Sequence, residues 1–160
     1  MRRVLIAISL LCLLPPASFA GTTTNAPAST QSRVVKVLPQ FLDLKGRSAL
    51  SPSLYDRDAY QARLRTHPAE RSGIRFHVQW RAYLAHDTNL TIRVEMRSDA
   101  RDKKPQNKTL ETQIESRKKS GWTSVDFTGE EYKKFGEVTA WCVTLWKGDQ
   151  RIGQQKSFLW

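Results

Sequence analysis

Apolar and polar side chains alternate in two stretches near the middle of the chain. Residues 74–81 place an apolar side chain at every second position, and residues 90–97 repeat the pattern. Because successive side chains of a strand point to opposite faces, each stretch predicts a half-buried β-strand. Residues 86–88 supply a turn between them. Since consecutive strands are usually neighbours, we expect these two to form an adjacent antiparallel pair.

Weaker strand patterns flank this pair. Residues 34–44 suggest an extended segment that Pro39 confines to a sheet edge or a bulge. Residues 110–114 alternate again. In residues 122–127 the apolar positions change parity after Trp122, which a β-bulge would reconcile.

The last third of the chain predicts two further strands. Residues 138–146 carry apolar side chains on both parities, as in a central strand that is covered on both faces. Residues 147–150 form a hairpin turn, and residues 151–160 are the returning last strand. The Gly-bounded stretch 129–136 predicts a single helical turn that crosses between two sheets.

Start and stop signals predict one longer helix over residues 54–66. Ser53 and Asp56 have capping-box spacing, Pro52 suits a helix entrance, and His67 and Pro68 end the element. The expected fold is all-β and mainly antiparallel: a two-sheet, immunoglobulin-like or fibronectin-III-like sandwich of six to seven strands, with this amphipathic helix inserted near the N-terminus. Residues 34–160 form its single domain.

The N-terminus has the pattern of a secretory signal. Arg2 and Arg3 precede the apolar run 4–14, which is too short to span a bilayer, and the small residues of 18–20 suit cleavage after Ala20. Lipidation at Cys12 is the alternative. Residues 1–20 are thus expected to be removed, residues 21–33 to form a disordered tether, and the protein to be periplasmic or extracellular.

Charge and cysteine content narrow the picture further. The chain has 26 Lys and Arg against 15 Asp and Glu; without Arg2 and Arg3 the remaining 24 basic residues give a net charge of +9. Partners selected by charge are therefore anionic. Cys142 alone remains after cleavage, so an internal disulfide is excluded. Its apolar surroundings predict a buried side chain, and a reactive thiol is the alternative.

Segments along almost the whole mature chain resemble a group of small exported bacterial proteins of unknown function. The resemblance rests on residues 38–47 and the stretch that follows to Gly73, on residues 132–137 and on the ending 155–160. It implies an immunoglobulin-like or fibronectin-III-like sandwich and no known activity.

If the two alternating strands are adjacent, their polar faces form one basic surface. The residues of this predicted basic face are Arg75, His77, Arg81, Arg93 and Arg97. Such a patch suits anionic glycans, lipid head groups or an acidic partner protein. An ordinary solvated sheet face, partly neutralised by Glu95, is the alternative interpretation.

Three tryptophans gather near the C-terminus. Trp141, Trp146 and Trp160 would stack sugars or anchor a partner chain if they were exposed. The two-sided apolar pattern around them favours packing in the core instead.

No catalytic, cofactor or metal motif is recognised. His67, His77 and His86 lack zinc-ligand spacing, and Asp56 and Asp58 suit a helix start better than acid-base chemistry. Asn89 and Asn107 head glycosylation sequons. We expect a noncatalytic binding or assembly module of the cell envelope, with an anionic component or another envelope protein as its partner, no nucleic acid, and no membrane span after cleavage. A small envelope hydrolase and, less favoured, an outer-membrane barrel are the alternatives.

Overall fold

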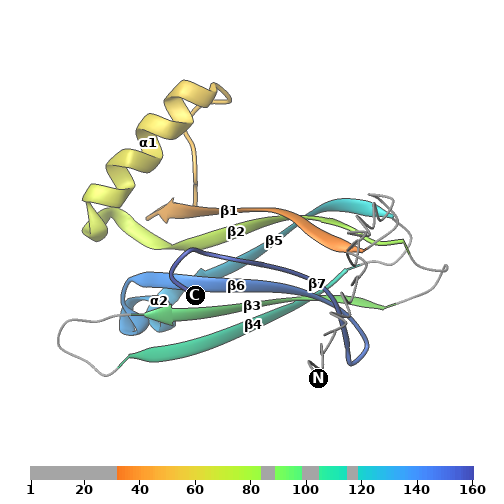
Figure 1. Cartoon of the computed structure of the whole chain (residues 1–160). Coiled ribbons are helices and arrows are strands. Elements are labelled where there is room, and N and C mark those ends of the chain that lie inside the picture. The colour runs from red at the N-terminus through yellow and green to blue at the C-terminus, as the bar shows by residue number, and fades with distance from the viewer. Residues whose placement is uncertain (1–31, 84–88, 99–104, 115–118) are drawn as a thin grey trace, which may run out of the picture.

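Seven antiparallel strands form two sheets that pack face to face in the computed structural model of the protein (Figure 1). The structure describes residues 32–83, 89–98, 105–114 and 119–160. The elements in chain order are β1 (Arg33–Asp43), α1 (Leu54–Thr66), the 3₁₀ turn η1 (Pro68–Glu70), β2 (Arg71–Arg81), β3 (Leu90–Ser98), β4 (Gln106–Ile114), β5 (Ser120–Thr128), α2 (Gly129–Phe135), β6 (Val138–Lys147) and β7 (Gln150–Lys156).

The strand order divides the chain between a three-stranded and a four-stranded sheet. The first sheet has the order β1-β2-β5 and the second β4-β3-β6-β7. β1 is an edge strand, as Pro39 predicts, and β6 is a central strand, as its two-sided apolar pattern predicts. The predicted signal peptide, residues 21–31 of the predicted tether and the turn at 86–88 lie outside the described residues, whereas Arg33, the last residue of that tether, begins β1.

The prediction that residues 74–81 and 90–97 pair side by side is wrong. β2 pairs with β1 and β5, whereas β3 pairs with β4 and β6 in the other sheet. Their apolar sides therefore meet face to face across the core. Alternation gives each strand one apolar side, but it is equally satisfied by a partner in the opposite sheet.

The core lies between the two sheets. Its fully buried centre includes Phe76 and Val78 of β2, together with Ile92 and Val94 of β3. Helix α2 connects the sheets and closes one end, where the rings of Tyr132 and Phe135 pack edge to face on Phe127 at centroid distances of 5.8 and 5.3 Å. The predicted crossover with two inward aromatics is thus confirmed.

Helix α1 packs outside the first sheet, over the end of β1 (Figure 1). Leu42 and Leu64 are almost completely buried there, separate from the main core. Gln61 fixes the helix to the strand, because its side-chain amide accepts from the Phe41 N–H at 2.8 Å and donates to the Phe41 carbonyl at 2.9 Å. The rest of the outer face of this sheet is not covered by α1.

Two further predictions about strands need correction. The bulge predicted near Trp122 is absent, because β5 pairs with β2 without a register shift from Ser120 to Thr128. Trp122 simply points away from the core. The last strand ends at Lys156 rather than at Trp160, since a turn follows in which the Trp160 N–H donates to the Ser157 carbonyl.

Candidate binding surface

The two outer faces of the sandwich carry the side chains that the sequence singles out. Because β2 and β3 belong to different sheets, the predicted basic face is divided. Arg75, His77 and Arg81 lie on the outer face of the three-stranded sheet, whereas Arg93 and Arg97 lie on the outer face of the four-stranded sheet. The prediction of one continuous patch of five residues is therefore wrong.

On the four-stranded sheet, the guanidinium groups are stacked on tryptophan rings. The Cζ atom of Arg93 lies 4.5 Å from the ring centroid of Trp146, and that of Arg97 lies 4.1 Å from the ring centroid of Trp160. Arg93 also forms an ion pair with Glu111 at 2.6 Å. Each ring is therefore covered by an arginine of the same chain, and part of the arginine charge is already neutralised by Glu111.

The three predicted tryptophans therefore have two different environments. Trp141 faces the core and packs edge to face on Phe76, with 6.3 Å between the centroids. Trp146 and Trp160 lie on the outer face, contrary to the core packing favoured for them. The Trp146 indole N–H donates to the buried Thr144 hydroxyl at 2.7 Å, which holds that ring against the sheet.

On the three-stranded sheet, side chains form cross-strand rows on the outer face. The register aligns Lys36, Gln79 and Trp122 across β1, β2 and β5. The next row contains Leu38, His77 and Ser124. A third row, nearer to α1, contains Gln40, Arg75 and Asp126.

Trp122 is the exposed aromatic residue of this face. It is 53% exposed although it lies within a continuously paired strand. Sequence reasoning missed it because a bulge was invoked to turn it inward. Its parity with the polar residues Ser124 and Asp126 is the signal that places it outside.

The charges on this face differ between its two ends. Arg75 donates two hydrogen bonds to the Asp126 carboxylate, each 2.6 Å long, so that this pair largely neutralises itself. At the other end, neither Lys36 nor Arg81 forms an ion pair with another described residue. The end that carries Trp122 is therefore the cationic end.

His77 lies between the two ends and is hydrogen-bonded to Ser124, with 2.9 Å between Nδ1 and Oγ. Partial burial lowers the pKa of His77, and the nearby Arg75 guanidinium lowers it further. A lowered pKa favours the neutral form of the ring, which offers hydrogen bonding to this surface.

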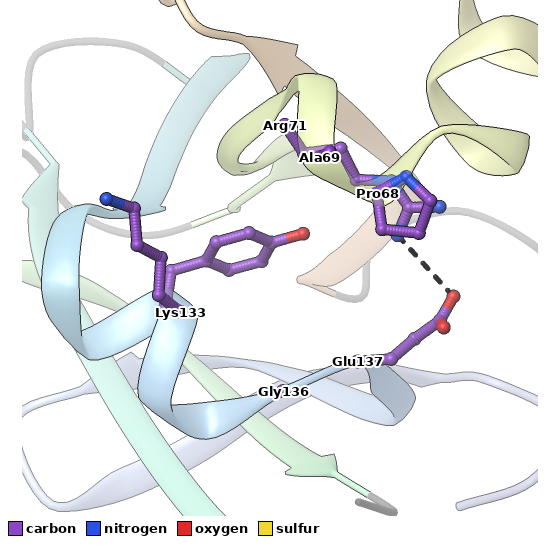
Figure 2. A pocket seen from close by; sticks show the side chains of 7 residues that line it. Pro68, Ala69, Arg71, Lys133, Gly136 and Glu137 are labelled. Carbon is purple, nitrogen blue, oxygen red and sulfur yellow. Dashed lines mark ion pairs between the residues drawn. The ribbon is translucent and has the colours of Figure 1, made fainter.

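A cavity of about 470 Å³ lies between η1 and α2 (Figure 2). Pro68 and Ala69 form one wall, and Lys133, Gly136 and Glu137 form the other. Arg71 also lines the cavity; its side chain is only 3% exposed and lies 3.6 Å from the Glu137 carboxylate. Because the Arg71 guanidinium also donates to the carbonyls of α1, its role here is structural.

A second cavity of about 420 Å³ lies beside α1 and is lined by Leu50, Ser51, Asp56, Ala59, Tyr60 and Arg63. His77 lines neither cavity. His86 falls outside the described residues. Among the residues that the structure does describe, no carboxylate hydrogen-bonds to the His77 ring.

No protein-family model, curated protein or solved structure matches the chain. In the described part of the chain, every helix is too short or too polar to span a lipid bilayer.

Proposed function

We propose that the chain is an exported, noncatalytic binding module of the cell envelope. It binds an anionic envelope component through the cationic end of the outer face of the three-stranded sheet. We name this the open face: Lys36, Gln79, Arg81 and Trp122.

One observation carries this proposal. A half-exposed tryptophan and two cations without an ion-pair partner among the described residues lie together on a rigid, hydrogen-bonded sheet. Exposed aromatic rings and unneutralised cations both gain free energy from a ligand that covers them. On the opposite sheet, the rings of Trp146 and Trp160 are each covered by an arginine guanidinium, so the described residues of that face offer no uncovered tryptophan.

The strand order supports an immunoglobulin-like, fibronectin-III-like topology. If the strands are named A, B, C, C′, E, F and G in chain order, the sheets become ABE and C′CFG. Strands C, F and G share one sheet in the immunoglobulin arrangement, with A, B and E in the other. This scaffold presents flat sheet faces, which suit binding better than they suit an enclosed reaction.

A hydrolase is less favoured by the same geometry. A serine nucleophile needs a base that is itself oriented by a third group, beside a pocket that holds the substrate. His77 and Ser124 are in contact, but they lie on an open sheet face, and neither described cavity includes them.

Export is proposed from the N-terminal pattern. Expression of the full chain in a bacterial host should yield a periplasmic or secreted product whose mass corresponds to a start at Gly21. Protein that is recovered from the cytosol with residues 1–20 still attached would contradict this part of the proposal.

Binding is tested by co-sedimentation of that product with cell-envelope fragments from the bacterium that carries the chain. We expect sedimentation at low salt and release as salt rises, because exposed charges are screened. The double variant Lys36→Glu, Arg81→Glu should stay in the supernatant. The double variant Arg151→Glu, Lys156→Glu makes the same change in net charge on the opposite face and should bind like the wild type. Equal loss in both variants would overturn the assignment to the open face.

A further inference from the structure

The backbone on both sides of Trp122 is fixed in the sheet, although the Trp122 indole is exposed. Its backbone neighbours Gly121 and Thr123 pair with Trp80 and Val78 of β2. The Trp80 indole donates to the Thr123 hydroxyl at 3.0 Å on the core side. An aromatic ring on such a fixed strand is preorganised, since little conformational entropy is lost when a ligand covers it.

The neighbours of Trp122 are hydrogen-bonding and cationic groups. Gln79 is its direct cross-strand partner, and Lys36 is the next residue in the same row. Because adjacent strands are about 4.8 Å apart, the row spans about 10 Å. Arg81 follows Gln79 on the same face of β2. The open face therefore offers an aromatic ring, then an amide, then cations, over a length comparable to that of two linked sugar rings.

From this arrangement we infer that the occupant of the open face is an acidic polysaccharide. The inference rests on the function proposed above and names its ligand class. A pyranose ring packs its apolar C–H face on the Trp122 indole, Gln79 hydrogen-bonds the ring hydroxyls, and Lys36 and Arg81 bind a carboxylate of the same or the next sugar.

The two other tryptophans on an outer face support the choice of Trp122. Trp146 and Trp160 each have an arginine guanidinium within 4.5 Å of the ring centroid, where a sugar would have to stack. Trp122 has no such cation–π partner among the described residues, which leaves its ring available to a ligand. The cations beside it favour an acidic sugar over a neutral one by charge complementarity.

The test is calorimetric titration of the exported full-chain product with galacturonate oligosaccharides. Neutral dextran oligosaccharides of similar length, polyglutamate, and vesicles of anionic phospholipid serve as comparison probes. We expect the uronate oligosaccharide to bind and the dextran to bind at least ten-fold more weakly, because it lacks carboxylates for Lys36 and Arg81.

Variants at Trp122 separate stacking from charge. Trp122→Ala should weaken uronate binding about ten-fold, the effect of one lost aromatic contact, while Trp122→Tyr retains most of the affinity. The side chain is half exposed, so both variants should fold, which circular dichroism and a urea unfolding curve verify.

Three results would overturn the inference. The first is that Trp122→Ala binds uronate as tightly as the wild type. The second and third are that polyglutamate, or the vesicles, bind as tightly as uronate with the same dependence on Trp122, which would indicate an acidic protein or a lipid surface. After any of these three results, the double variant Lys36→Glu, Arg81→Glu decides how much of the proposal fails. If it still abolishes sedimentation with envelope fragments, only the sugar assignment fails. If it does not, the proposed function fails as well.

Discussion

Arg71 joins helix α1 to the sandwich, and its replacement tests how the fold is held together outside the main core. Its Nε donates to the Leu64 carbonyl and its Nη2 to the Arg65 carbonyl, in the last turn of α1. The guanidinium carbon lies 4.0 Å from the ring centroid of Phe41. These contacts are buried, whereas the acidic partner Glu137 is 58% exposed.

The size of the effect follows from these contacts. A hydrogen bond to a charged donor contributes about 1.5–3 kcal/mol, and a desolvated cation–π contact about 2 kcal/mol. Removal of a buried charge returns part of this sum, because the charge no longer has to be desolvated. We therefore expect Arg71→Met to lower the free energy of unfolding by about 3 kcal/mol.

Urea unfolding at pH 7, followed by tryptophan fluorescence and circular dichroism, measures this difference. Glu137→Gln is the matched control, and it should cost less than about 1 kcal/mol because the Glu137 carboxylate is 58% exposed and solvent screens its attraction for Arg71. If Arg71→Met unfolds within about 0.5 kcal/mol of the wild type, the buried contacts of Arg71 do not hold α1 to the sandwich. If Glu137→Gln costs as much as Arg71→Met, the ion pair outweighs the hydrogen bonds to the helix.

Other contacts give three further predictions. Burial raises the pKa of Asp43, but hydrogen bonds from the Arg47 and Lys45 backbone and from the Arg47 and Tyr60 side chains outweigh it and hold the pKa at about 2. A lowered pKa adds stability above the unfolded value near 3.9, and this stability is lost as pH falls through about 2. Urea unfolding from pH 5 to pH 2 should therefore show a loss of about 1–2 kcal/mol in the free energy of unfolding that Asp43→Asn abolishes. If the free energies of the wild type and Asp43→Asn fall in parallel with pH, this prediction is contradicted. Gly153→Ala should cost about 1–3 kcal/mol in the same assay, because the added Cβ would lie 2.9 Å from the Arg33 Cα, a backbone atom that cannot move aside as a side-chain tip can. An unchanged urea midpoint would show that β7 can shift away from β1. Cys142, 1% exposed, should react with a thiol reagent only at the rate of unfolding, and fast labelling of the native protein would disprove its burial.

The open face could be predicted only in part. Arg81 was identified as outward because alternation in β2 is unbroken, and the same alternation places Gln79 on that side. In β1 a register shift between Val34 and Lys36 interrupts the alternation, so that Val34 and Val37 are both buried while Val35 is 39% exposed. No local pattern marks such an irregularity, since it arises from how β1 pairs with its neighbour.

The sequence by itself determined where the strands lie along the chain, though not all of their ends, and which side of most strands is apolar. Period-two alternation and the positions of Pro and Gly act through neighbours along the chain, so strands and turns can be predicted from them without a structure. Only the tertiary structure decided that Arg75 and Arg93 lie on opposite faces of the sandwich, and that Trp146 is covered while Trp122 is exposed. The physical reason is that the apolar side of a strand can be buried against any apolar surface. Whether two strands are neighbours in one sheet or face each other across the core therefore depends on contacts between residues far apart in sequence.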